Sequence, residues 1–237
     1  MNKAKVYLIP NLLGEAASIE QSLPPYNLQV IDSLQYFAVE HLKDMRRLLV
    51  KCGLKHKINQ SEFFEINKHS QKQEADQILQ VLKSGNSVGV VSDAGCPGIA
   101  DPGTEIIRLA HQNSIEVVPL IGPSSILLAL ISSGFNGQAF TFHGYLPRES
   151  NKRIKVLKKI EAISAGDGST QLFMETPYRN QAVFSDVLNC LNPRTMLCIA
   201  MDLSLSGSKI RSHPISYWKK KQAPKLQKRP AIFLISA

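Results

Sequence analysis

The stretch VVSDAGCPGIADPG, residues 90–103, decides the fold class. An apolar strand pattern at Ser87–Ser92 enters a loop with Gly or Pro at five positions, and a helical pattern begins at Gly103. In open α/β sheets, ligands bind beyond the C-terminal ends of the strands. The glycines let the backbone approach a ligand closely, and the prolines stiffen the loop, which lowers the entropy cost of presenting its amides. The stretch therefore predicts an α/β domain with a ligand-binding loop.

Asp93 stands at the end of the predicted strand, where its carboxylate could accept hydrogen bonds from a ligand hydroxyl or amine. The alternative is a tight strand-to-helix turn in which Asp93 only caps backbone amides. Neither G-x-G-x-x-G nor G-x-x-x-x-G-K-[ST] occurs in the chain, so NAD-type and P-loop nucleotide sites lack their motifs.

The rest of the first half alternates short apolar runs with longer amphipathic stretches. That alternation predicts a mostly parallel sheet with helices around it. The predicted strands are Lys5–Ile9, Gln29–Ile31, Glu62–Ile66, Ser87–Ser92 and Ile115–Ile121. The predicted helices are Phe37–Cys52, Lys72–Ser84 and Gly103–Asn113.

The second half has the same α/β character. Its predicted strands are Ala139–His143, Ser169–Glu175, Thr195–Asp202 and Ala231–Ile235. Its predicted helices are Ser124–Ser133, Lys152–Ala165 and Tyr178–Asn189. A turn at Gly122-Pro123 separates the halves, so we expect two α/β domains, residues 1–121 and 122–237, with a ligand in the cleft between them.

The charge is distributed unevenly along the chain. The 237 residues carry 28 Lys and Arg against 19 Asp and Glu, a net charge of +9. Residues 1–118 hold 12 basic and 13 acidic side chains, whereas residues 119–237 hold 16 and 6. Two clusters, Arg148–Lys159 and Trp218–Arg229, carry much of the excess. A basic half favours a polyanionic partner such as nucleic acid, and the alternative is a lysine-rich surface that only keeps the protein soluble.

Composition argues against several classes of protein. The longest uninterrupted apolar run, Ile126–Ile131, has six residues, far fewer than the roughly 20 of a membrane helix. Val6–Ile9 is too short for the core of a signal peptide. The four cysteines form no C-x-x-C pair, which argues against disulfides and zinc knuckles. A cytoplasmic protein with reduced thiols is therefore expected.

Residues 90–103 resemble the signature loop of the tetrapyrrole (corrin/porphyrin) methylase superfamily, the class III S-adenosylmethionine-dependent methyltransferases. The resemblance is greatest to the ribosomal RNA small subunit methyltransferase I branch, which typically reads V-S-D-A-G-T-P-x-I-S-D-P-G. Shorter pieces agree with that branch in order and spacing, over nearly the whole chain. They are IPNL at 9–12, VPLIGPSS at 118–125, SSGF at 132–135, FTFHGYLP at 140–147 and FMETPYR at 173–179.

The resemblance implies a two-domain α/β protein, usually a homodimer, that binds S-adenosylmethionine in the interdomain cleft and holds no metal. Carried over by position, the residues expected to meet the cofactor are Pro10, Asp93, Ala94, Gly95, Cys96, Ile99, Asp101, Ser124, Ser125, Met174, Ala200, Met201, Pro230 and Ala231. For Met174, Ala200 and Met201, packing within core strands is the alternative.

Three segments depart from the pattern of that branch. Residues 39–43 read VEHLK where the branch usually reads A-E-D-T-R. Residues 65–69 read EINKH where it has an H-x-x-N-E-like segment, and residues 201–205 read MDLSL where it has R-E-L-T-K. The cofactor part of the pattern is kept better than the part we assign to the substrate. The resemblance therefore supports methyl transfer more than any one substrate.

Methyl transfer from a sulfonium is an in-line displacement in which the protein mainly positions the nucleophile and excludes water. A ribose hydroxyl would gain from a general base within hydrogen-bond reach. We predict Glu175 and Glu40 as the catalytic carboxylates, although Glu175 could instead pair with Arg179. His41 and His143 are further candidates, for which a structural or solvated role is the alternative.

Three functions follow from these observations. The first is methylation of RNA, with ribose 2′-O methylation of small-subunit ribosomal RNA as the specific expectation and the basic half holding phosphates. The second is methylation of a small molecule such as a tetrapyrrole precursor. The third is a diverged RNA-binding protein without turnover. The charge distribution favours the first or third, and the intact loop favours the first or second.

Overall fold

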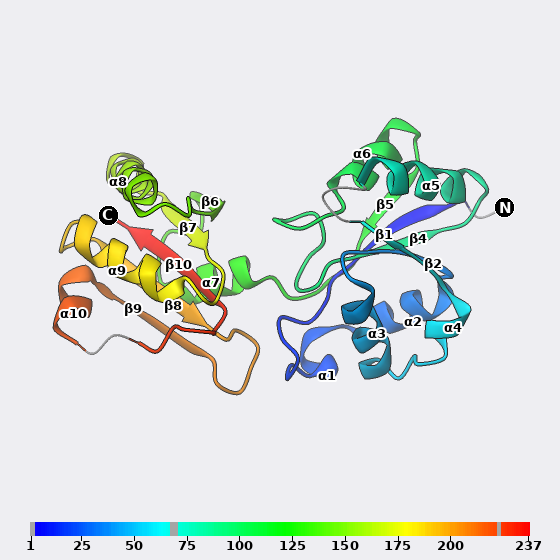
Figure 1. Cartoon of the computed structure of the whole chain (residues 1–237), viewed down its shortest axis with the longest axis horizontal. Helices are drawn as coiled ribbons and strands as arrows, with labels where there is room; N and C mark the ends of the chain where they lie inside the picture. The colour runs from blue at the N-terminus through cyan, green and yellow to red at the C-terminus, as the bar shows by residue number, and fades with distance from the viewer. Residues whose placement is uncertain (1–2, 67–70, 222–223) are drawn as a thin grey trace. The chain divides into compact units, whose positions relative to one another are not determined.

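The computed structural model describes residues 3–66, 71–221 and 224–237. The chain divides into two compact units, Met1–Ser124 and Ser125–Ala237, each built on one five-stranded sheet (Figure 1). The α/β fold class predicted from the sequence is confirmed. The expected boundary after residue 121 lies slightly before the division that the structure shows.

The sheet of the first unit is entirely parallel, with strand order β3-β2-β4-β1-β5. Its strands are β1 (Lys5–Ile9), β2 (Tyr36–Val39), β3 (Glu62–Glu65), β4 (Val88–Val91) and β5 (Glu116–Pro119). Its helices are α1 (Ile19–Ser22), α2 (Pro25–Ser33), α3 (Leu42–Lys51), α4 (Lys57–Gln60), α5 (Gln71–Lys83) and α6 (Thr104–Gln112). Within this unit α5 and α6 cover one face of the sheet, and α2, α3 and α4 cover the other (Figure 1).

Two predictions for the first unit were wrong. Gln29–Ile31 is not a strand but part of α2, which begins with Pro25 in its first turn and buries Val30 and Ile31. The helix expected from Phe37 begins only at Leu42, because Tyr36–Val39 pairs with both β3 and β4 as a buried strand. At Tyr36–Val39 the helical pattern is therefore overridden by pairing within the sheet.

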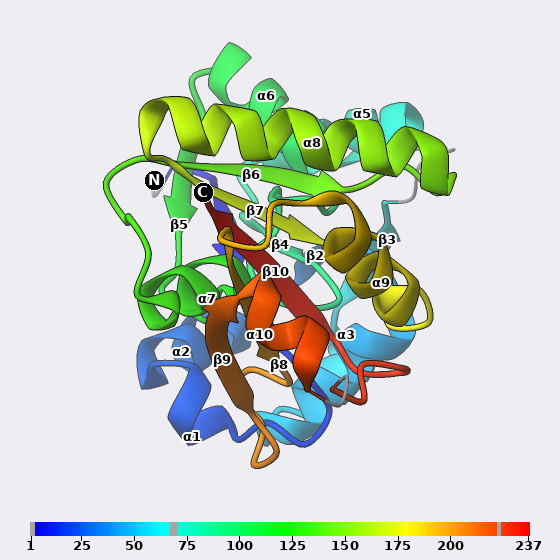
Figure 2. The same cartoon turned by 90° about the vertical axis from the view of Figure 1, so that its left-hand side faces the viewer.

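The second unit has a mixed sheet with strand order β6-β7-β10-β8-β9, in which only β6 and β7 are parallel. Its strands are β6 (Phe140–Tyr145), β7 (Thr170–Met174), β8 (Met196–Met201), β9 (Lys209–Pro214) and β10 (Ala231–Ser236). Its helices are α7 (Ser125–Ser133), α8 (Ser150–Asp167), α9 (Asn180–Cys190) and α10 (Ile215–Lys220). Figure 2 shows α8, α9 and α10 on the near face of this sheet.

The elements β9 and α10 were missed by the sequence analysis. β9 is an edge strand that reads KIRSHP and has no buried residue, so it lacks the apolar run that marks the other strands. α10 has only six residues. In the parts of the chain that the structure describes, no helix is both long and apolar enough to span a membrane. All four cysteines are free.

Candidate cofactor and catalytic site

The loop that follows β4 lies at the centre of the first unit's sheet edge. β4 has β2 on one side and β1 on the other, and all three strands are parallel. Their C-terminal ends therefore meet at one edge, where the loop is flanked by Asn11 after β1 and by Glu40 and His41 after β2. This is the edge at which open α/β sheets bind ligands.

Asn11 ties the end of β1 to this loop. Its side-chain Nδ2 donates to the backbone oxygens of Ser92 and Asp93, each at 3.0 Å. Its backbone exchanges two hydrogen bonds with Gly95, of 2.8 and 3.1 Å. Gly95 adopts φ +69°, a left-handed conformation that disfavours a side chain. The sequence analysis quoted Asn11 within a motif but gave it no role.

Pro10 and Gly122 approach each other closely on the β1 side of the loop. A Cβ atom on Gly122 would lie 2.2 Å from Pro10 Cγ, so only glycine fits there. Cys96 is half-buried, and its Sγ lies 3.6 Å from the backbone oxygen of Pro123. Ala94 and Ile99 are exposed on the loop. The structure thus gathers Pro10 and the predicted loop residues around one sheet edge.

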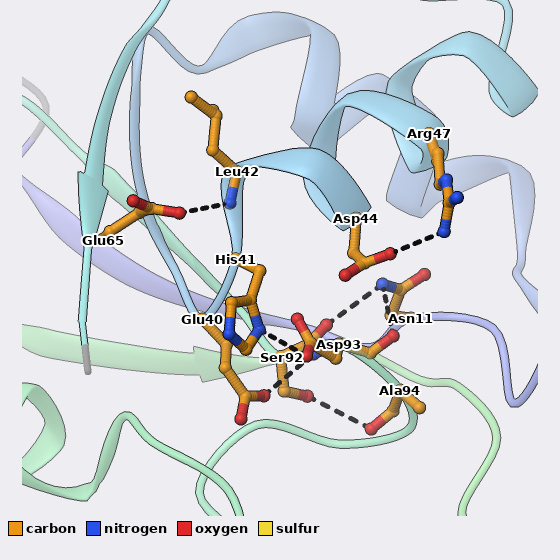
Figure 3. Close-up of polar contacts among 10 residues, drawn as sticks. All are labelled: Asn11, Glu40, His41, Leu42, Asp44, Arg47, Glu65, Ser92, Asp93 and Ala94. Carbon is orange, nitrogen blue, oxygen red and sulfur yellow. Dashed lines mark hydrogen bonds and ion pairs between the residues drawn. The ribbon is translucent and has the colours of Figure 1, made fainter. Parts of the chain in front are cut away.

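Three side chains join the ends of β2 and β4 (Figure 3). His41 Nδ1 lies 2.6 Å from Asp93 Oδ2. The backbone N–H of Asp93 donates to Glu40 Oε2 at 3.1 Å. Asp93 Oδ1 is buried and accepts no hydrogen bond from the described residues. That oxygen is a free acceptor for a ligand that offers an N–H or O–H group.

Negative charge is concentrated at this edge. Burial, together with the charges of Glu40 and Asp93, raises the pKa of Asp101 to about 7. Burial also raises the pKa of Glu40. The hydrogen bond to Asp93 raises the pKa of His41, whose side chain is 61% exposed. The edge therefore favours cationic groups and protons.

Glu40, His41 and Asp93 each place one polar atom within 4.8 Å of the others. His41 Nδ1 and Asp93 Oδ2 already satisfy each other through the 2.6 Å contact. We therefore describe the three as a hydrogen-bonded triad. The first backbone N–H of α3, that of Leu42, donates to Glu65 Oε1 at 2.8 Å and so fixes the chain just after His41. Residues 67–69 of the EINKH segment lie outside the described residues.

The second unit gathers its own predicted cofactor residues at one end of its sheet. Ile232 of β10 pairs with Met174 on one side and with Ala200 on the other. Ala231 pairs with Met201 in the next register position. Pro230 is exposed and precedes β10, and Ser124 and Ser125 stand at the junction of the units, at the start of α7.

Glu175, predicted as a catalytic carboxylate, is fully engaged. Its side chain is 0% exposed and forms an ion pair with Arg179. Its other oxygen accepts from the backbone N–H of Thr176 at 2.6 Å. His143 contacts Gln171 Oε1 at 2.7 Å. Of the four candidate bases, Glu40 and His41 belong to the first unit, and within that unit they lie beside the loop.

Comparisons with known proteins agree with the sequence resemblance. No protein-family model matches the chain. The chain is 31% identical over 211 residues to the ribosomal RNA small subunit methyltransferase I of Vibrio cholerae serotype O1, covering 89% of this chain and 69% of that protein. It is also 31% identical over 206 residues to the protein of the same name from Thermotoga maritima, covering 85% of this chain and 89% of that protein.

The chain belongs to the ribosomal RNA small subunit methyltransferase I family. It is therefore an S-adenosylmethionine-dependent methyltransferase, as its loop sequence predicts. Solved structures support the fold: the methyltransferase CobJ matches 98% of the chain with a TM-score of 0.64 at 15% identity. A uroporphyrin-III C-methyltransferase from Thermus thermophilus, solved with S-adenosylhomocysteine, matches 98% with a TM-score of 0.52 at 14% identity.

The residues of this family member fit its cofactor. S-adenosylmethionine carries hydroxyl and amino donors and a sulfonium charge. Asp93 Oδ1 offers a buried acceptor without a partner in the described chain, and the surrounding carboxylates favour a cation. The left-handed glycine at position 95 leaves backbone rather than side chain facing that region.

Proposed function

We propose that this methyltransferase acts on ribosomal RNA of the small subunit, with a ribose 2′-hydroxyl as the methyl acceptor. The observation that carries the proposal is the His41–Asp93 pair at the cofactor loop of a chain whose relatives are named ribosomal RNA methyltransferases. A hydroxyl acceptor must lose a proton, and this pair provides a proton acceptor at that place.

The cofactor supplies the electrophilic methyl group, and the chain supplies position and a base. Asp93 holds the imidazole through Nδ1, which leaves Nε2 of the exposed ring to accept the hydroxyl proton. Glu40 accepts the N–H of Asp93 and fixes the carboxylate that orients the ring. Glu175, the other carboxylate predicted from the sequence, is instead assigned a structural role, because it forms an ion pair with Arg179 within the second unit.

The basic second unit is proposed to hold RNA phosphates through Lys219, Lys220 and Lys221, which are exposed at the end of α10. Neighbouring residues have other roles. Trp218 is 4% exposed, and its Nε1 donates to the backbone oxygens of Leu197 and His213. Tyr217 stacks on His213 with ring centroids 3.9 Å apart.

Two arginines of the basic clusters are engaged within the protein. Arg229 forms an ion pair with Asp202. Arg153 of the other basic cluster is buried, with its Nε 2.7 Å from Asp186 Oδ2. Residues 222 and 223 of the Trp218–Arg229 cluster lie outside the described residues.

Salt-dependent RNA binding tests this proposal. Each phosphate contact contributes a log–log salt slope of about −0.7 on single strands. Changing Lys219, Lys220 and Lys221 together to Ala is expected to weaken RNA binding and flatten the slope, while affinity for S-adenosylmethionine stays unchanged. Salt-independent RNA binding by the wild type, or wild-type RNA affinity in the triple variant, would instead favour a small-molecule substrate.

A homodimer is also proposed, on family resemblance alone. Light scattering at micromolar concentration is expected to give about twice the 26.2 kDa mass of one chain. A mass near that of one chain would contradict it.

A further inference from the structure

Helix α3 carries a basic face, although the acidic and basic residues of the first half of the chain are nearly equal in number. Lys43, Arg46, Arg47 and Lys51 are spaced three, four and eight residues from the first, which places them on one side of the helix. The same ten residues contain one acidic side chain, Asp44. The opposite side buries Met45, Leu48 and Leu49 against the core. The basic side is therefore the outer face of the helix.

This face is a groove with an apolar floor and a cationic rim. Leu42 and Val50 line it together with the four basic residues, and its volume is about 520 Å³. Val50 is 53% exposed there. Its apolar side chain therefore lies on the surface among positively charged side chains. Such a surface suits a ligand with both apolar faces and anionic groups, which is the composition of a nucleotide strand.

The basic side chains fall into two classes. Arg47 pairs with Glu15 and Asp44, and Lys51 donates to the backbone oxygens of Glu15 and Ala17. These contacts hold the rim in place. Lys43 and Arg46 have no ion-pair partner within residues 3–66, 71–221 and 224–237. Their charges are therefore available to a bound anion.

The groove begins where the triad ends. Leu42, the first residue of α3, follows His41 directly, and His41 lies 2.6 Å from Asp93 of the cofactor loop. Figure 3 shows α3 leaving the site from this point, with Asp44 and Arg47 on its first turns. A nucleotide strand bound along α3 would thus lead to the sheet edge where the candidate base, His41, lies.

We propose that the basic face of α3 binds the phosphate backbone of the RNA strand next to the methylated nucleotide, with Lys43 and Arg46 as the direct phosphate contacts. This inference rests on the proposed RNA substrate. It adds a binding surface in the first unit, whose net charge gave no sign of one.

The test compares two double variants of equal charge change. Lys43→Ala/Arg46→Ala removes the two unpaired cations of α3. Lys83→Ala/Arg108→Ala removes two exposed cations from α5 and α6, on the opposite face of the same sheet. Binding of a fluorescent single-stranded fragment of small-subunit ribosomal RNA is measured from 0.05 to 0.3 M salt. S-adenosylhomocysteine affinity and melting temperature are measured alongside.

Two lost phosphate contacts should make the log–log salt slope shallower by about 1.4, which weakens binding about 25-fold at 0.1 M salt. The control pair should stay close to wild type. Lys43→Arg/Arg46→Lys should restore most of the affinity because both charges return. Val50→Ser should weaken binding a few-fold without changing the slope, since it removes apolar contact only.

An unchanged affinity and slope in Lys43→Ala/Arg46→Ala, with RNA binding and methylation intact in the wild type, would overturn this inference and leave the proposed function standing. An equal loss in the α5/α6 control would also overturn it, because the effect would then come from net charge. A wild type that neither binds nor methylates RNA would overturn both proposals.

Discussion

The imidazole Nδ1 of His41 lies 2.6 Å from Asp93 Oδ2, which links the second residue after β2 to the second residue after β4. Position 41 is one at which this chain departs from the A-E-D-T-R pattern of the branch it resembles. The substitution thus places a titratable ring, oriented by a loop carboxylate, at the edge where the cofactor is expected. The chemistry proposed for the chain depends on that pair.

His41 should therefore be required for turnover. His41→Gln is expected to lower kcat by about 100-fold or more, the usual contribution of a general base. Because Asp93 raises the pKa of His41, the wild-type rate should rise with pH through an apparent pKa above 6.5, where the ring becomes neutral. The matched control is His56→Gln, which breaks an exposed contact with Asp32 of 2.9 Å and should leave the rate unchanged. A pH profile that is the same in wild type and His41→Gln would exclude His41 as the base.

Glu175 should matter for stability more than for proton transfer. Both of its oxygens are engaged and its side chain is buried. Glu175→Gln is expected to destabilise the fold by about 2 kcal/mol, since it leaves Arg179 without its counter-charge, while kcat falls only a few-fold. Urea unfolding and steady-state rates measure the two effects separately. A stable variant that has lost all turnover would return Glu175 to the catalytic role predicted from the sequence.

The backbone at Gly95 should control cofactor binding. Gly95→Ala forces a side chain into the left-handed region and should cost about 1–2 kcal/mol. The added Cβ would lie 3.4 Å from Leu13 Cδ2, an ordinary contact, so the cost is conformational rather than steric. Gly85→Ala carries a comparable strain at φ +92° just before β4, at the opposite end of the strand. Calorimetry should show weaker S-adenosylhomocysteine binding in the first variant only. Equal affinities in both would mean that the loop at Gly95 is structural.

Asp101 should make the fold less stable as pH rises. Its pKa is about 7 in the folded chain, against an ordinary value of 3.8 for an aspartate side chain. The folded state therefore binds more protons between these values, and the free energy of unfolding falls as pH increases from about 4 to about 7. Asp101→Asn removes this dependence, so its melting temperature should exceed that of wild type by more at pH 8 than at pH 5. An equal difference at both pH values would mean that the carboxyl titrates normally.

The fold class and the central loop were predictable because their signals are local. The strand into residues 90–103 and the helix after it are contiguous in sequence, and glycines and prolines mark the turns. The boundary between α2 and β2 was not predictable from periodicity, since Val30 and Ile31 are buried on a helix while Phe37 and Ala38 are buried in a strand. Burial alone does not separate the two.

The site depended on contacts that are distant in sequence. Asn11 reaches Ser92 across 81 positions, and His41 reaches Asp93 across 52. A lone histidine gives no sign of such a partner, which is why Glu175, placed within a family motif, was preferred to it. The basic face of α3 was hidden for another reason, because the thirteen acidic residues of positions 1–118, twelve of them outside α3, offset the basic residues of that half.

The central claim is methyl transfer to ribosomal RNA, and one assay tests it directly. The purified chain is incubated with S-adenosylmethionine labelled in its methyl group and with small ribosomal subunits that lack the modification, and the RNA is then digested with alkali. The account predicts label in the RNA, retained in alkali-resistant dinucleotides because a 2′-O-methyl group blocks cleavage, and lost in His41→Gln. Binding of the cofactor without any label in the RNA would contradict it.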